Sequence, residues 1–170
     1  IHPALLLYTG AVVTEGVAAG LVVAGIAALP GKAASKNVYV ARIALAGAVF
    51  GIATLVRPQV LALAPPLAFV FVSGRARARA LAAAAVLGAS LLTVARWTAR
   101  NCARMHRCAL VSVNGGWNLL IGAESDTGGW APLDTPDACK TVWDEAQKDV
   151  CFEHAARADL RDDVRLVPRL

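Results

Sequence analysis

The sequence predicts a mainly helical, polytopic membrane protein, in which about four membrane helices precede a small mixed α/β segment outside the membrane. Apolar residues make up 57% of the 170 residues, charged residues make up 17%, and the mean hydropathy is +0.55. Soluble domains usually contain about 25% charged residues. The charges are also divided unevenly, because residues 1–101 hold nine Lys or Arg and one acid, Glu15, whereas residues 102–170 hold eight basic and eleven acidic residues. These two parts are therefore expected to lie in different solvents.

Apolar runs predict the membrane helices. A bilayer core about 30 Å thick requires about 20 apolar residues of helix, and the first run reaches that length. The third run contains Pro65-Pro66, which lack backbone donors and are expected to kink or break the helix. The fourth run ends at Arg96-Trp97, a pair typical of a membrane interface. The expected helices cover residues 8–29, 38–56, 60–73 and 80–97, within a membrane region that ends at residue 101.

The short loops predict the orientation of these helices. Loops 30–42 and 74–79 hold three basic residues each, and basic loops favour the cytoplasmic side. Glu15, Arg57 and everything after residue 97 then face the outside. Both ends of residues 43–73 are cytoplasmic, so this segment either crosses the membrane twice or forms a re-entrant hairpin.

The outer segment, residues 102–170, has a mixed pattern. Short β-prone runs at 109–113 and 117–121 alternate with Gly, Asn and Asp turn signals, which predicts strands and turns. An apolar stripe predicts a helix at 141–160, with Thr141 as its N-cap. The last residues turn apolar and basic, as expected at the start of a further membrane helix.

The four cysteines all fall in this outer segment, where an oxidising environment would permit disulfides. They are Cys102, Cys108, Cys139 and Cys151, and intervals of five and eleven residues within the two pairs do not resemble zinc-ligand spacing. A helix from Thr141 would carry Cys151 about 15 Å along its axis, whereas bridged Cα atoms lie about 4.4 to 6.8 Å apart. A Cys139–Cys151 bridge is therefore disfavoured unless residues 136–145 fold back.

Several functional classes lack their motifs in this sequence. It has no phosphate-binding glycine loop, nucleophile elbow or paired-histidine zinc motif, and its three histidines are isolated. The net charge of +5 comes from the residues that flank the apolar runs rather than from a basic face on a folded domain. No metal site and no nucleic-acid partner are therefore expected.

Several segments are similar to one family of membrane enzymes. Short segments before residue 59 resemble the membrane part of these enzymes. Longer segments after the fourth apolar run resemble the stretch that follows a transmembrane helix in bacterial members. The segments are His2-Pro3, Tyr8-Thr9-Gly10, Thr14-Glu15, Ala53-Thr54-Leu55-Val56-Arg57-Pro58, Trp97-Thr98-Ala99-Arg100-Asn101, Val111-Ser112-Val113-Asn114-Gly115-Gly116-Trp117-Asn118-Leu119-Leu120-Ile121-Gly122 and Thr127-Gly128-Gly129-Trp130. They resemble GT-C type glycosyltransferases that use polyprenyl-phosphate sugars, the group of protein mannosyltransferases and aminoarabinose lipid A transferases. Arg96 and Gln59 replace the Pro and Glu that are usual in this pattern.

The resemblance implies an integral protein of a bacterial inner membrane, with residues 102–170 on the periplasmic or extracellular side. It implies transfer of a sugar from a polyprenyl phosphate carrier to a lipid, glycan or protein acceptor on the outer face, among membrane lipids. In the family the catalytic acid lies in an outer loop that precedes the matching region. The chain is therefore expected to be a fragment that contains no catalytic residue and is inactive alone.

Six residues are candidates for substrate binding. Arg57 and Arg100 would stabilise the negative charge of the phosphate leaving group, or would only anchor helices at the interface. Glu15 would orient the sugar or fix a basic partner such as Arg57; a bland alternative is an acid at headgroup level. The remaining candidates are Asn114, Trp117 and Asn118, which offer hydroxyl bonding and ring stacking, although Asn-Gly-Gly is equally a turn signal.

Two other functional classes fit the same residues. A transporter or lipid-flipping protein also uses a helix interrupted by proline and a lone intramembrane acid. In a noncatalytic subunit of a membrane complex, Glu15 and Arg57 would be packing contacts.

Overall fold

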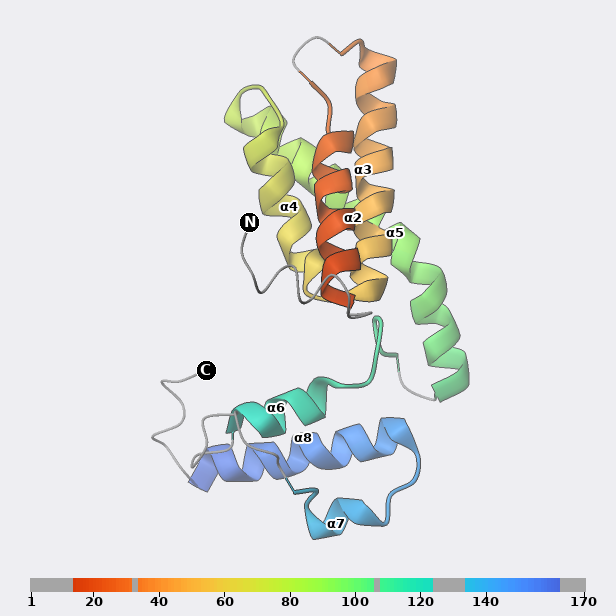
Figure 1. Ribbon diagram of the computed structural model, residues 1–170, viewed down its shortest axis with the longest axis vertical. Helices are drawn as coiled ribbons and strands as arrows, with labels where there is room; N and C mark the ends of the chain where they lie inside the picture. The colour runs from red at the N-terminus through yellow and green to blue at the C-terminus, as the bar shows by residue number, and fades with distance from the viewer. Residues whose placement is uncertain (1–13, 32–33, 106–107, 124–133, 163–170) are drawn as a thin grey trace. The chain divides into compact units, whose positions relative to one another are not determined.

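The chain divides into two compact units, residues 1–100 and residues 101–170. The computed structural model describes residues 14–31, 34–105, 108–123 and 134–162 (Figure 1). The prediction of a mainly helical protein is confirmed, and no strand occurs in these ranges. The predicted boundary after residue 101 lies one residue from this division.

The described residues of the first unit form four helices. They are α2 (Thr14–Ala28), α3 (Lys36–Val56), α4 (Val60–Phe71) and α5 (Ala76–Met105), and the last residues of α5 belong to the second unit. Each helix overlaps one of the predicted apolar runs, although α5 starts four residues before and ends eight residues after the predicted range 80–97. Residues 8–13, the start of the first predicted helix, lie outside the described ranges.

Two of these helices, α3 and α5, are long and apolar enough to cross a membrane. At 1.5 Å per residue, the 21 residues of α3 extend about 31 Å, which matches a hydrocarbon core of about 30 Å. The described parts of α2 and α4 are shorter, with 15 and 12 residues. Length alone therefore marks α3 and α5 as candidate membrane spans.

Helix α4 continues through Pro65 and Pro66, so of the predicted kink or break at this pair the break does not occur. The two prolines lack amide hydrogens, which leaves the carbonyls of Leu61 and Ala62 without the usual helical donors. Tertiary packing offsets this loss, because Val60, Ala64 and Ala68 are buried in the core of the unit.

Small residues allow α3 to approach its neighbours closely. A Cβ atom at Gly47 would lie 2.4 Å from the Cβ of Ala89 on α5, and one at Gly51 would lie 2.5 Å from the Cβ of Thr93. On α5, the buried Ser90 hydroxyl lies 3.0 Å from the Gly47 carbonyl oxygen and donates a hydrogen bond across the contact. Interfaces between membrane helices commonly combine small residues with such bonds.

Helix α2 contacts α3 through an aromatic ring. Phe50 of α3 is fully buried, and a Cβ atom at Gly25 of α2 would lie 2.9 Å from its ring. Glycine at position 25 therefore leaves the space that this ring occupies.

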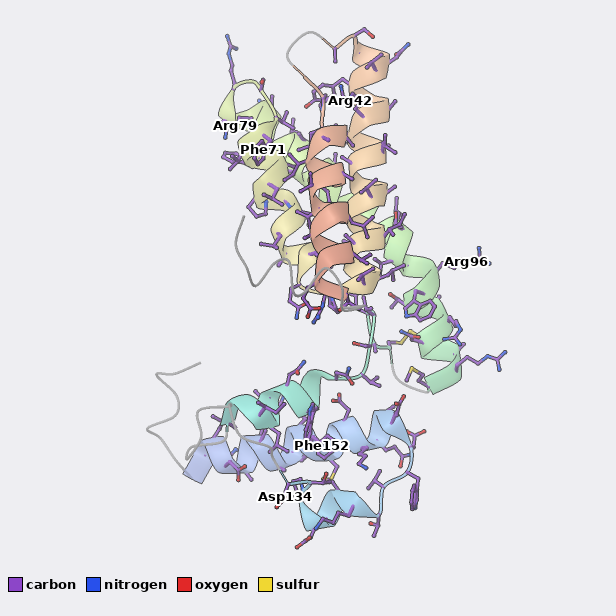
Figure 2. The ribbon with its side chains drawn as sticks, in the orientation of Figure 1. Arg42, Phe71, Arg79, Arg96, Asp134 and Phe152 are labelled. Carbon is purple, nitrogen blue, oxygen red and sulfur yellow. A yellow bond between two sulfur atoms is a disulfide. The ribbon has the colours of Figure 1, made fainter. Side chains whose placement is uncertain are left out.

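Two arginines bind the carboxyl ends of helices at the basic end of the unit. Arg42 of α3 donates to the carbonyl oxygens of Ala28 (3.0 Å) and Ala27 (2.7 Å), and Arg79 of α5 donates to that of Phe69 (2.6 Å). Helix carboxyl ends carry partial negative charge, which favours cations there. Figure 2 shows Arg42 and Arg79 at one end of this unit and Arg96 toward the other. Both loops predicted to be cytoplasmic thus lie at the same end.

In the second unit, the part of the chain that the structure describes forms three further helices. They are α6 (Gly115–Ala123), α7 (Asp137–Lys140) and α8 (Glu145–Asp162). The predicted strand at 117–121 is wrong because this run lies inside α6, where Gly116, Leu120 and Ala123 recur at helical spacing and are buried. At 109–113 the chain forms neither strand nor helix. Packing against α8 thus overrides the β preference of these apolar residues.

Helix α8 begins four residues later than predicted. The Asp144 carboxylate accepts the amide hydrogen of Gln147 at 2.9 Å, so Asp144 rather than Thr141 acts as the N-cap. Thr141 instead follows the short helix α7, which reverses the chain.

The expectation against a Cys139–Cys151 bridge is wrong for the same reason. The chain folds back over residues 136–145, which brings the two Cα atoms to 5.8 Å, and the disulfide forms. The second disulfide joins Cys102 to Cys108. No free cysteine remains.

Exchange of glycine for alanine at two positions tests the packing of α3 against α5. We expect Gly47→Ala to lower the free energy of unfolding by about 1–3 kcal/mol, because the added methyl overlaps Ala89. Gly88→Ala is the matched control, since nothing lies within 4 Å of its new Cβ, and it should gain up to about 1 kcal/mol from helix propensity. Melting temperatures of the full-length protein in detergent measure both. Equal shifts in the same direction would contradict this contact.

Mass mapping of peptides under non-reducing conditions tests the disulfides. We expect linked peptides that join Cys102 to Cys108 and Cys139 to Cys151. Any peptide that joins one pair to the other would refute the described fold-back before α8.

Candidate functional site

The structure brings two candidate residues together as an ion pair. Glu15 lies in the first turn of α2, and Arg57 is the C-cap residue of α3, whose own amide donates to the Ala53 carbonyl at 2.8 Å. The Arg57 Nη2 atom donates to Oε1 of Glu15. Contact between Glu15 and a basic partner, one of the predicted alternatives, is therefore present in the structure.

The backbone after α3 fixes the base of the Arg57 side chain. The amide of Val60 donates to the Arg57 carbonyl at 3.0 Å, and the amide of Leu61 donates to that of Pro58 at 3.2 Å. This tight corner starts α4 immediately after α3. Arg57 is therefore anchored through its amide, its carbonyl and its guanidinium.

Helix dipoles favour both charges of the pair. The amino end of α2 has partial positive charge, which suits Glu15, and the carboxyl end of α3 has partial negative charge, which suits Arg57. The side chains keep relative exposures of 63% and 39%, so both reach the surface of the unit. This end lies opposite the basic loops (Figure 1).

The guanidinium geometry suits an anionic ligand with two oxygens. Arginine has five N–H donors in a planar fork, which matches phosphate oxygens in bidentate fashion. The bond to Glu15 engages one edge of Arg57 and thereby restricts the rotation of the fork. An exposed pair of this kind adds about 0–1 kcal/mol to stability, so orientation is its larger effect.

Arg100 contacts a neighbouring aromatic residue. Its guanidinium carbon lies 5.0 Å from the centroid of the Trp97 ring, one helical turn earlier in α5. A cation over an indole face is a stabilising contact, and both residue types are common at membrane boundaries. This contact matches the anchoring alternative for Arg100.

The three remaining candidates lie at the start of α6 in the second unit. The amide of Asn118 donates to the Asn114 carbonyl at 3.1 Å, so Asn114 begins the helix. Both asparagines are exposed, whereas Trp117 is half-buried and its ring centroid lies 5.0 Å from that of Phe152. Asn-Gly-Gly is thus a helix start rather than a turn between strands.

Asp149 is a central residue of this region that the sequence pattern did not single out. It is 3% exposed, and its Oδ1 atom accepts the amides of Gly116 at 2.7 Å and Trp117 at 3.2 Å. A Cβ atom at Gly116 would lie 1.9 Å from the Asp149 carbonyl oxygen. The sequence does contain a signal for this residue. Asp149 lies three residues from both Ala146 and Phe152, which places an acid on the buried face of α8.

Asn101 is a second structural residue absent from the candidates. Its side chain is 2% exposed, and its Nδ2 atom donates to the carbonyl oxygens of Ala109 and Val111, both at 3.1 Å. It therefore holds the backbone that follows the Cys102–Cys108 disulfide.

Within the described ranges, no group of three His, Cys, Asp or Glu side chains is arranged to hold a metal ion. Comparison with protein-family models, curated proteins and solved structures finds no match to this chain.

Removal of the Asp149 carboxylate tests how α6 is held. We expect Asp149→Ala to cost about 1–3 kcal/mol and to accelerate hydrogen exchange at the amides of Gly116 and Trp117, because both lose their acceptor. Asp149→Asn keeps an acceptor oxygen and should lose less. Hydrogen-exchange mass spectrometry of the α6 peptide is the measurement.

The control is Asp137→Ala, whose carboxylate is exposed and pairs only locally with Lys140 at 2.6 Å. It should leave exchange in α6 unchanged. Equal protection of α6 in the wild type and in Asp149→Ala would contradict the role of Asp149.

Proposed function

We propose that the chain is part of an integral membrane glycosyltransferase, which moves a sugar from a polyprenyl phosphate carrier to an acceptor on the outer membrane face. The observation that carries this proposal is the Glu15–Arg57 ion pair at the end of the first unit opposite its basic loops. Two candidate membrane spans and the local sequence resemblance to GT-C type enzymes support it.

The proposed topology follows from the charges at the two ends. Lys36, Arg42 and the basic residues before and within the start of α5 would face the cytoplasm. Helices α3 and α5 would cross the membrane, and α4 would return the chain from Arg57 to the basic end, which places the Glu15–Arg57 pair at the outer boundary. Residues 102–170 would then lie outside, where both disulfides are stable.

In this proposal Arg57 binds the phosphate of the carrier. Transfer breaks the bond between the anomeric carbon of the sugar and a phosphate oxygen, and the departing carrier phosphate gains negative charge. Hydrogen bonds aimed at developing charge stabilise the transition state more than the substrate. Glu15 acts as a positioning residue that orients the guanidinium, and the acceptor gives up its proton to a base that is not among the six candidate residues.

A double-mutant cycle in the full-length protein tests these two roles. We expect Arg57→Ala to lower kcat/KM for sugar release from a polyprenyl phosphate donor by about 10²–10³-fold, as for loss of one transition-state donor. Glu15→Gln should lower it by about tenfold, because the guanidinium stays but loses its fixed orientation. The double variant should match Arg57→Ala alone, since Glu15 acts only through Arg57.

The matched control is Arg77→Ala, an exposed arginine at the opposite end of the unit. Its turnover should equal that of the wild type. Unchanged turnover in both Glu15→Gln and Arg57→Ala would refute this site, and strictly additive losses would refute the coupling.

A further inference from the structure

The second unit contains a pocket at the amino ends of α6 and α8. Of the predicted binding residues, Asn114 and Trp117 line it. Its volume is about 190 Å³. The residues that define its chemistry are two aromatics, Trp117 and Phe152, and four polar residues, Asn114, Glu145, Lys148 and Asp149. Asn118, a predicted binding residue, does not line it.

The apolar wall of this pocket is fixed by packing. The rings of Trp117 and Phe152 are tilted by 53° with their centroids 5.0 Å apart, and Phe152 is 8% exposed. Asp149 fixes the backbone beneath Trp117 through the amides of Gly116 and Trp117. The indole is therefore held in one position before any ligand binds, which reduces the entropic cost of binding.

The polar wall offers donors and acceptors side by side. Lys148 is half-buried, and within the described residues no carboxylate pairs with its ammonium group. Asn114 supplies an amide that both donates and accepts, and Glu145 supplies an exposed carboxylate. Alternating donors and acceptors suit hydroxyl groups, because each hydroxyl both donates and accepts.

Size and charge narrow the ligand further. A volume of about 190 Å³ corresponds to about six water molecules, which is comparable to one six-membered ring with its hydroxyls. Two carboxylates and one ammonium give the pocket a negative balance, which disfavours phosphate and uronate groups. An aromatic wall beside a few convergent polar groups is a feature of ligand sites, although this pocket is smaller than the roughly 300–1,000 Å³ of sites for drug-sized ligands.

We infer that this pocket binds one uncharged pyranose ring, which stacks on Trp117 while Lys148, Asn114 and Glu145 bond its hydroxyls. The inference rests on the proposed function, because a sugar is chosen as the ligand on the basis of the proposed glycosyltransferase activity. It adds Lys148 and Glu145 to the binding residues and separates them from Asn118.

Saturation-transfer NMR with the full-length protein and methyl α-mannopyranoside, methyl β-galactopyranoside and methyl β-glucuronide tests the inference. We expect at least one of the two uncharged probes to receive saturation more strongly than the glucuronide. Lys148→Gln should lower the affinity for that probe by about tenfold, as expected for loss of a hydrogen bond from a charged donor. Trp117→Phe should also lower this affinity, although the variant keeps an aromatic ring in the core.

Two matched controls isolate the pocket. Lys140→Gln removes an exposed lysine that pairs with Asp137, and Trp143→Phe alters a tryptophan that is 94% exposed. Both should leave probe binding unchanged. Binding that persists undiminished in Lys148→Gln and Trp117→Phe, or no transfer to any probe, would overturn the inference.

The failure of this inference is distinguishable from the failure of the proposed function. If probe binding is absent but sugar release still depends on Arg57, the pocket assignment is wrong and the glycosyltransferase proposal stands. If the pocket binds the probe but Arg57→Ala turns over normally, the pocket stands and the transfer proposal is wrong.

Discussion

Close packing of α3 against its neighbours is the constraint on which the first unit depends. Gly47 and Gly51 let α5 approach on one face, and Gly25 of α2 accepts the ring of Phe50 on another. Contacts of this closeness permit little rotation or sliding of α3, because any shift would produce overlap. The position of Arg57 at the end of α3 is thereby set before it meets Glu15. The ion pair is thus a consequence of small residues about one to three helical turns away.

In the second unit, a glycine contact again sets how closely two helices pack, and a buried carboxylate holds them together. Gly116 lets α6 approach the backbone of α8, and the buried Asp149 carboxylate holds the amino end of α6 there. The disulfide between Cys139 and Cys151 then fixes the segment that reverses before α8. In both units a glycine contact sets the geometry, and one charged side chain fixes a functional group, the Arg57 guanidinium in the first unit and the half-buried Trp117 in the second. The proposed phosphate site and the pocket at Trp117 both follow from this arrangement.

Hydrophobic runs were sufficient to place the described helices of the first unit, because each run is strongly apolar and ends at charged, proline or glycine residues. The contact between Glu15 and Arg57 was also among the predicted alternatives, since two opposite charges at one membrane boundary favour each other. The second unit was harder to predict. Strand preference at 117–121 lost to packing on α8, and the Cys139–Cys151 bridge depended on where α8 begins. Such long-range contacts leave little periodic signal in a sequence.

The central claim is that Arg57, oriented by Glu15, binds the phosphate of a lipid carrier. The most direct measurement is the dissociation constant of polyprenyl phosphate without its sugar, for the full-length protein in lipid nanodiscs. The account predicts that Arg57→Ala weakens this binding by at least about tenfold, the loss expected for a charged hydrogen-bond donor. An unchanged dissociation constant in Arg57→Ala would contradict the claim.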